Sequence, residues 1–139
     1  GGGVACVVSP DIRQDVWRKF LVNCSFNAIS AIGQLTYGKM VQTEAVRALI
    51  NQLADEVVSV AQHQGIALTH PEAQQANDMI PQTMPGLLSS TALDLARKKP
   101  SEIEFLNGLV VRKGKEYGIA TPANQSVYAL VKMLEDAQV

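Results

Sequence analysis

The feature that most constrains the fold is residues 10–34, whose apolar side chains recur three and four positions apart. This is the spacing of a helix that buries one face. Ser9 suits an N-cap and Pro10 suits the first helical position. We therefore expect one long helix around which the rest of the chain packs. Its core face would comprise Trp17, Phe20, Leu21, Cys24, Ala28, Ala31, Ile32 and Leu35, and its second apolar face Val22, Phe26, Ile29 and Gly33.

A narrow polar strip separates these two apolar faces and spans roughly 80° of the helical wheel. A solvent-exposed helix face is usually broader and richer in charge, whereas this strip holds one charged residue. It is either an ordinary solvated face or the wall of a site for a polar ligand. The polar strip consists of Lys19, Asn23, Asn27, Ser30 and Gln34.

The remaining sequence predicts shorter helices and shows no strand alternation after the first eight residues, which we expect to be irregular or extended. Thr69 with Glu72, and Ser101 with Glu104, have the spacing of capping boxes. We expect a loop at Tyr37-Gly38-Lys39. A later helix should end near Met79 and be followed by a second loop across Pro81 and Pro85-Gly86. The prediction is an all-α domain of about six helices, with the later ones near residues 43–64, 69–79, 87–98, 101–118 and 121–136.

Glycines indicate where these helices end or pack closely. Gly65 and Gly118 follow apolar helical patterns and suit left-handed C-terminal caps. Gly108 lies inside a helical pattern, where glycine costs about 1 kcal/mol relative to alanine, so we expect another backbone or a ligand to approach it. Along residues 43–64, we expect Glu56 to be an ordinary solvated position, as with Glu44, Arg47 and Asp55.

Composition excludes several classes of function. The formal net charge is -1 and no basic cluster is present, which argues against nucleic acid and anionic membranes as partners. No apolar run reaches the ~18–20 residues of a membrane span. Cys6 and Cys24 lack metal-ligand or redox spacing, and His63 and His70 lack a ligand cluster, so we expect no metal. Free cysteines fit a reducing compartment, so a cytoplasmic location is expected.

Four segments, in this order, resemble the C-terminal domain of ketopantoate reductase (2-dehydropantoate 2-reductase). The resemblance covers nearly the whole chain from Asp11. The segments are Trp17-Arg18-Lys19-Phe20-Leu21-Val22-Asn23-Cys24-Ser25-Phe26-Asn27, Ser89-Ser90 with Asp94, Glu102-Ile103-Glu104-Phe105-Leu106-Asn107-Gly108, and Gly118-Ile119-Ala120-Thr121-Pro122-Ala123-Asn124.

The resemblance implies a fold like the helical domain of 6-phosphogluconate dehydrogenase and NADPH-dependent reduction of a 2-keto acid in pantothenate and coenzyme A synthesis. By match to the family motif, Lys19 would be the general acid at the keto oxygen and Glu102 would position or polarise it. Asn23 and Asn27 would contact polar groups of the substrate, and Ser90 would bind its carboxylate. The chain departs from the family pattern at Tyr37, where an asparagine is usual, and at Thr91, where methionine is frequent.

The resemblance also implies a dinucleotide-binding Rossmann domain, which nothing in residues 1–9 supplies. Gly1 to Gly3 have neither the spacing of a phosphate-binding loop nor a preceding strand and are interpreted as residues left by cloning. We therefore expect residues 10–139 to be a helical substrate-binding and catalytic domain, inactive alone, with the Rossmann domain as a partner. A homodimer stays open, as do two alternatives: a related 2-keto acid or 3-hydroxy acid dehydrogenase, and a helical dimerisation module without chemistry.

Overall fold

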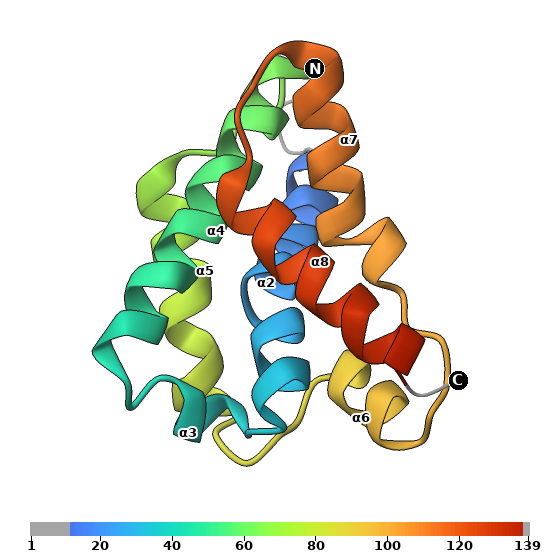
Figure 1. Cartoon of the computed structure of the whole chain (residues 1–139). Helices are drawn as coiled ribbons and strands as arrows, with labels where there is room; N and C mark the ends of the chain where they lie inside the picture. Colours follow the sequence, from blue (N-terminus) through green and yellow to red (C-terminus); the bar gives the residue numbers. More distant parts are fainter. Residues whose placement is uncertain (1–11, 138–139) are drawn as a thin grey trace.

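The computed structural model describes residues 12–137, which form seven α-helices and one short 3-10 helix with no strand in that range (Figure 1). The predicted all-α class is therefore confirmed for this part of the chain. Ser9, Pro10, Cys6 and the expected lead-in lie outside the described residues. The elements are α2 Ile12–Gly33, α3 Tyr37–Met40, α4 Glu44–His63, α5 His70–Thr83, α6 Ser90–Ala96, η1 Ile103–Phe105, α7 Asn107–Tyr117 and α8 Pro122–Ala137.

Helix α2 is the central element, as the sequence predicts. It packs against α4, α5, α6 and α8, and Figure 1 shows it running through the middle of the molecule, partly behind α8. Its predicted core face is buried at Leu21, Cys24, Ala28 and Ala31, each 1% exposed or less. Its second apolar face supplies Phe26, which packs with Met40 and Ile50 in a separate cluster. Both apolar faces are thus covered along the middle of α2, but the predicted core face is wrong at its end, where Ile32 and Leu35 are 36% and 40% exposed.

Three helix ends have the predicted local chemistry. Gly65 has φ 84°, and the N–H of Ile66 donates to the carbonyl of Ala61, as in a Schellman stop. Gly118 has φ 72° and ends α7 in the left-handed conformation. The Thr69–Glu72 capping box is complete, since the Thr69 hydroxyl accepts from the N–H of Glu72 and the Glu72 carboxylate accepts from the N–H of Thr69.

One predicted loop and two predicted helix boundaries are wrong. Residues Tyr37–Met40 form the short helix α3 rather than a loop. Helix α5 does not end near Met79 but continues through Pro81 to Thr83, because a proline near the C-terminal end removes only one N–H from the helix. Helix α6 begins at Ser90 instead of Leu87, and Ser89 is its N-cap, accepting from the N–H of Ala92 at 3.0 Å.

The predicted capping box at Ser101 and Glu104 is also wrong. The Ser101 hydroxyl accepts from the N–H of Ile103 at 3.2 Å, and the Ser101 N–H donates to Glu135 instead of Glu104. Glu104 turns away and accepts from the Tyr128 hydroxyl at 2.5 Å. Tertiary partners on α8 therefore replace the local bond that the spacing suggested.

Glu56 is not the solvated residue that its position in the sequence suggested. Its carboxylate accepts from the backbone N–H groups of Ala123 and Asn124, both at 2.9 Å, and from the Asn124 amide at 2.8 Å. A side chain of α4 thus caps the first turn of α8. The close approach expected at Gly108 is confirmed, because a Cβ there would lie 2.9 Å from Cε1 of Tyr128.

Candidate functional site

The polar strip of α2 divides into a structural half and a free half. The Ser30 hydroxyl donates to the carbonyl of Leu35 and accepts from the N–H of Ser89. The Gln34 amide donates to the carbonyls of Ala31 and Ala92. These two residues therefore fix the end of α2 against α6, and their polarity needs no ligand to explain it.

The other three members of the strip keep their side-chain polar groups free. Among residues 12–137, the side chains of Lys19, Asn23 and Asn27 form no hydrogen bond or ion pair. Lys19 is exposed, Asn23 is half-buried, and Asn27 is only 6% exposed. The spacing of four residues places them on one line along the helix. An ammonium and two primary amides are thus available to a polar ligand, and their exposure decreases from Lys19 through Asn23 to Asn27.

The start of α6 is held against the inner end of this line. The Ser89 hydroxyl donates to the carbonyl of Asn27 at 3.0 Å, and the Ser89 N–H donates to the Ser30 hydroxyl at 3.1 Å. Both contacts are buried. Ser90, the next residue, begins α6 with an exposed side chain. The structure therefore brings Ser90 next to the segment of α2 that contains Asn27.

The segment before α7 approaches α2 from another side. The buried Asn107 amide donates to the carbonyl of Cys24 at 3.0 Å and to Oδ1 of Asn124 at 2.8 Å. Ile103 is fully buried in a cluster that also contains Ala28 and Ala92. Glu102 directly precedes η1, and its side chain is exposed. Three elements that are distant in sequence thus meet α2 between residues 24 and 30.

Lys19 and Glu102, the two charged residues that the family resemblance assigns to catalysis, form no ion pair in the described residues. Their charged atoms therefore lie more than the 4.0 Å ion-pair limit apart. Both side chains are exposed, and water solvates each charge without a partner. Burial of the ammonium, which would have required a compensating carboxylate, does not occur in this chain by itself.

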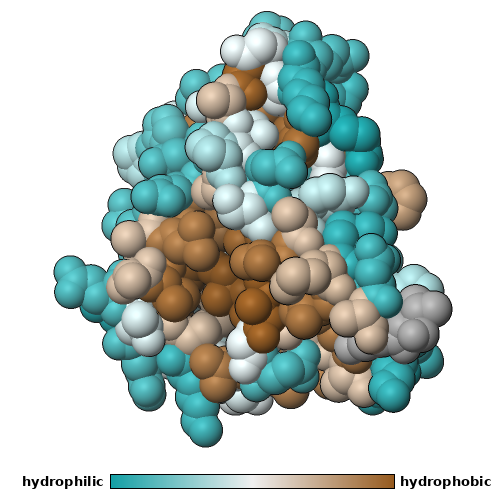
Figure 2. Space-filling view, in the orientation of Figure 1, coloured by the Kyte–Doolittle hydropathy of each residue, from teal (hydrophilic) through white to brown (hydrophobic). Residues whose placement is uncertain are grey.

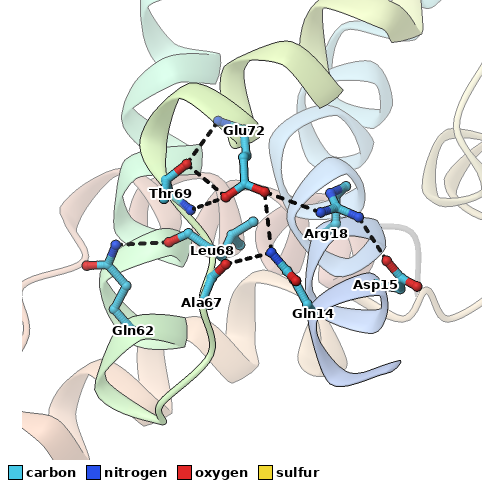
Figure 3. A network of polar contacts seen from close by, with 8 residues as sticks. All are labelled: Gln14, Asp15, Arg18, Gln62, Ala67, Leu68, Thr69 and Glu72. Carbon is cyan, nitrogen blue, oxygen red and sulfur yellow. Dashed lines mark hydrogen bonds and ion pairs between the residues drawn. The ribbon is translucent and has the colours of Figure 1, made fainter. Parts of the chain in front are cut away.

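The residues beside Lys19 are engaged in a polar network that fixes the start of α2 to α5 (Figure 3). The Gln14 amide donates to the carbonyl of Ala67 at 2.6 Å and to Glu72 at 3.3 Å. Arg18 lies between Asp15, at 2.9 Å, and Glu72, at 3.5 Å. Arg18 and Lys19 are adjacent cations, yet within the described range only Arg18 forms an ion pair. The network therefore holds the helix in place while it leaves the Lys19 ammonium available.

Sequence reasoning missed how the loop before α6 is attached. The N–H of Tyr37 donates to the carbonyl of Leu87 at 2.9 Å, and the N–H of Gly38 donates to the carbonyl of Pro85 at 2.9 Å. The Tyr37 ring packs edge-on against Phe26, with centroids 5.5 Å apart, and burial raises the pKa of its phenol. The only available signal was the pair of serines at the start of α6, which are typical of a cap and do not reveal the long-range contact.

The described residues show no group of three or more His, Cys, Asp or Glu side chains that could hold a metal ion. They contain no strand and hence no glycine-rich turn between a strand and a helix that would bind a dinucleotide diphosphate. None of the helices in residues 12–137 combines the length and apolar character that a membrane span requires.

Residues 11–135 match the family described as ketopantoate reductase PanE/ApbA C terminal. The chain belongs to this family. It is 39% identical over 132 residues to a 2-dehydropantoate 2-reductase of Vibrio cholerae, covering 93% of this chain and 43% of that protein. It is 30% identical over 128 residues to the enzyme of the same name from Escherichia coli O157:H7, covering 90% of this chain and 40% of that protein. The chain therefore spans less than half the length of these curated relatives.

Solved structures of similar proteins share the fold. A PanE/ApbA family ketopantoate reductase from Ralstonia eutropha JMP134 superposes with a TM-score of 0.88 at 45% identity, covering 94% of this chain and 43% of that one. A D-mandelate dehydrogenase, solved with NADH and anilino(oxo)acetate, superposes equally well at 28% identity with the same coverage. Two proteins named for different substrates thus have this helical domain, so the fold alone does not select the substrate.

Proposed function

We propose that this chain is the substrate-binding and catalytic domain of an NADPH-dependent 2-dehydropantoate 2-reductase, which reduces ketopantoate to pantoate. The observation that supports this proposal is the row of unbonded Lys19, Asn23 and Asn27 on α2, beside Ser90 and Glu102 on elements docked against the same helix. The names of the 39% and 45% identical relatives support the same activity.

Lys19 would act at the keto oxygen. The reduced nicotinamide supplies a hydride to the carbonyl carbon when it is bound, and negative charge develops on the oxygen. An ammonium next to that oxygen stabilises the charge and donates the proton that completes the hydroxyl. Lys19 suits both tasks because no carboxylate of residues 12–137 forms an ion pair with it. Glu102 would orient the ammonium once substrate and the preceding domain enclose the site.

The neighbouring polar groups would bind the substrate. The amides of Asn23 and Asn27 offer donors and acceptors to carbonyl and hydroxyl groups, and Ser90 offers a hydroxyl to the carboxylate. Ser90 directly follows the N-cap Ser89. The inner position of Asn27, 6% exposed, means that a substrate would contact it only after entering between the elements. This gradient of exposure favours a ligand smaller than a peptide.

The dinucleotide would be held mainly by a preceding Rossmann domain, which is the proposed covalent partner of this domain. The choice of NADPH rather than NADH is part of the proposal, and the D-mandelate dehydrogenase neighbour was solved with NADH. Steady-state kinetics of the full-length protein with each cofactor would decide between them.

The test of the mechanism is substitution of Lys19 in the full-length enzyme. Lys19→Ala should lower kcat by roughly 10²–10⁴, which is the usual contribution of a general acid. Lys19→Arg should not restore the rate, because a guanidinium retains the charge but does not release its proton near neutral pH. The fold should survive both changes, since Lys19 is exposed and bonds to nothing in the described residues.

The matched control is Lys115→Ala, which removes an exposed lysine from α7. Its kcat should equal that of the unmodified enzyme. Circular dichroism and urea unfolding would show that all three variants fold. A Lys19→Ala enzyme with near-native kcat would refute the proposed role of Lys19.

A second test asks whether substrate binding and dinucleotide binding belong to separate domains. The 139-residue chain should fold but show no oxidation of NADPH in the presence of ketopantoate, because its described residues offer no dinucleotide site. Addition of the separately expressed Rossmann domain could restore some turnover. Clear turnover by the 139-residue chain alone would refute the two-domain proposal.

A different 2-keto acid is the alternative substrate, and Tyr37 favours it. Tyr37 is half-buried, and its backbone bonds to Leu87 in the loop that leads to Ser90. An aromatic ring near this loop favours a keto acid with a bulkier apolar group. We would compare kcat/KM for ketopantoate, 2-ketoisovalerate and benzoylformate. A higher value for benzoylformate would replace ketopantoate with an aromatic substrate and leave the role of Lys19 unchanged.

A homodimer is a further proposal for the quaternary structure. Apolar side chains gather in the lower half of the face shown in Figure 2, where α2 lies between α4 and α8. Helices α2 and α8 have exposed large apolar residues, including Ile32, Leu130 and Met133. Apolar surface of this kind is common at homodimer interfaces. Sedimentation equilibrium of the full-length protein would measure the association directly.

A further inference from the structure

A cavity of about 380 Å³ lies between α4 and α5, with Phe26 of α2 among its lining residues. None of the proposed catalytic or substrate-binding residues lines it. Its size falls within the range of small-molecule sites in proteins. The cavity is lined by Phe26, Val41, Arg47, Ile50, Asn51, Gln74, Asn77, Asp78, Pro81 and Gln82.

One buried group lining this cavity lacks a hydrogen bond. Asn77 is 3% exposed, and its amide nitrogen donates to the Ser25 hydroxyl at 3.0 Å. Ser25 in turn donates to the carbonyl of Leu21, so Ser25 has no proton left for Asn77. The Asn77 Oδ1 atom has no partner. Buried polar atoms are nearly always paired, so this acceptor indicates that a donor from a ligand or a water belongs beside it.

The remaining polar groups of the cavity are also largely unused. In the described part of the chain, the side chains of Asn51, Gln74, Asp78 and Gln82 form no hydrogen bond or ion pair. Arg47 donates from one nitrogen to the carbonyl of Val41 at 2.5 Å, and a guanidinium has five N–H groups. One cation, one carboxylate and several amides therefore surround the same volume without satisfying one another.

This set of groups defines the chemistry of a ligand. A planar guanidinium favours a carboxylate, to which it can donate two parallel hydrogen bonds. Asp78 and the Oδ1 atom of Asn77 are acceptors, so they require a hydroxyl or ammonium donor. Phe26 and Ile50 are buried apolar residues that suit a branched aliphatic group.

We propose that the α4–α5 cavity is a second small-molecule site that binds a short branched carboxylic acid with a hydroxyl or ammonium group. The carboxylate binds Arg47, the donor group binds Asp78 and Asn77, and the aliphatic branch contacts Phe26 and Ile50. Amino acids and hydroxy acids share this chemistry, and the experiment below separates them. The proposal does not depend on the catalytic role of the polar strip.

The test is an NMR titration of the ¹⁵N-labelled protein with three probes of the same carbon skeleton. L-valine has an ammonium group, 2-hydroxyisovalerate has a hydroxyl in its place, and isovalerate has neither. The side-chain amide signals of Asn77 and Asn51 should shift saturably with L-valine or 2-hydroxyisovalerate, and isovalerate should bind at least about fivefold more weakly. Whichever of the first two probes binds more tightly identifies the ligand as an amino acid or a hydroxy acid.

Two variants test the assignment of the groups. Arg47→Ala should weaken the binding at least about tenfold, whereas the control Arg97→Ala, an exposed arginine at the end of α6, should leave it unchanged. Asp78→Asn should weaken L-valine more than 2-hydroxyisovalerate. Arg47 is exposed, so its replacement should preserve the fold, which the amide spectrum itself would report.

Three outcomes would overturn the proposal. The first is the absence of saturable shifts for all three probes, which would leave water as the partner of Asn77. The second is shifts confined to the amides of Asn23 and Asn27, which would place the ligand on the polar strip. The third is binding that is equally tight in Arg47→Ala.

Discussion

The carboxylate of Glu56 should be one of the main stabilising groups of the domain. It receives three hydrogen bonds of 2.8–2.9 Å from the first turn of α8, two of them from backbone N–H groups. Those N–H groups have no partner inside their own helix, and the negative charge also interacts favourably with the positive end of α8. Glu56 therefore joins α4 to α8 through groups that no other described side chain satisfies.

Replacement of Glu56 by alanine removes all three bonds. Hydrogen bonds to a charged group contribute about 1.5–3 kcal/mol each, but they share one half-buried carboxylate, and water can reach part of the vacated space. Loss of an N-cap by itself costs about 1–2 kcal/mol. We therefore expect Glu56→Ala to lower the free energy of unfolding by about 2–4 kcal/mol. Tm should fall by about 5–15 °C for a domain of this size.

The assay is urea unfolding followed by circular dichroism at 222 nm. Glu56→Gln keeps the shape but loses the charge and one acceptor oxygen, so its unfolding free energy should lie between those of Glu56→Ala and the unmodified chain. The control is Glu116→Gln, because Glu116 forms only an exposed pair with Lys113 at 3.2 Å, and such pairs contribute about 0–1 kcal/mol. If Glu56→Ala and Glu116→Gln unfold at the same urea concentration, the capping role is wrong.

Further predictions concern close packing and a surface ion cluster. Gly114→Ala should lower the unfolding free energy by about 1–3 kcal/mol despite the better helix propensity of alanine. The reason is that the new Cβ would lie 2.7 Å from the carbonyl oxygen of Ile119. In the same urea assay, the control Gly86→Ala, whose Cβ would meet nothing within 4 Å, should change the unfolding free energy by less than about 0.5 kcal/mol. The Tyr128 hydroxyl bond, more than any other contact, holds the pKa of Glu104 below its ordinary value, so Tyr128→Phe should raise that pKa in an NMR pH titration. A carboxyl group whose pKa is lowered in the folded state stabilises the fold at pH values above its unfolded pKa, and that contribution is lost as the pH falls through the folded pKa. The difference in unfolding free energy between Tyr128→Phe and the unmodified chain should therefore shrink on acidification. A difference that grows would contradict the assigned bond.

The sequence by itself determined most of the helices, because their signals are local. The apolar spacing of residues 10–34 predicts two buried faces, and α2 buries both as far as Ala31, whereas Ile32 and Leu35 are exposed. Gly65, Gly118 and the Thr69–Glu72 pair act within a few residues of their own position, so their roles were predicted correctly. The row of Lys19, Asn23 and Asn27 was also foreseeable, since it depends only on helical periodicity, but their lack of partners in the described residues was not.

Long-range partners were decided only by the tertiary structure. Ser101 and Glu104 have capping-box spacing, yet the Ser101 N–H bonds to Glu135 and Glu104 bonds to Tyr128, both on α8. A hydrogen bond to a residue 24 or more positions away has no signature in local spacing. The same holds for Glu56, whose sequence context resembles any exposed glutamate.

The candidate site shows the same division. Residue types and spacing on α2 identified three of its five members, and the family resemblance supplied Ser90 and Glu102. Their approach to α2 results from buried contacts made by their neighbours, namely Ser89 with Asn27 and Asn107 with Cys24. Lys19 and Glu102 form no ion pair in residues 12–137, and both charges are exposed, where such a pair gains little. The cavity between α4 and α5 was not predictable at all, since its lining residues come from separate elements and form no motif in any one of them.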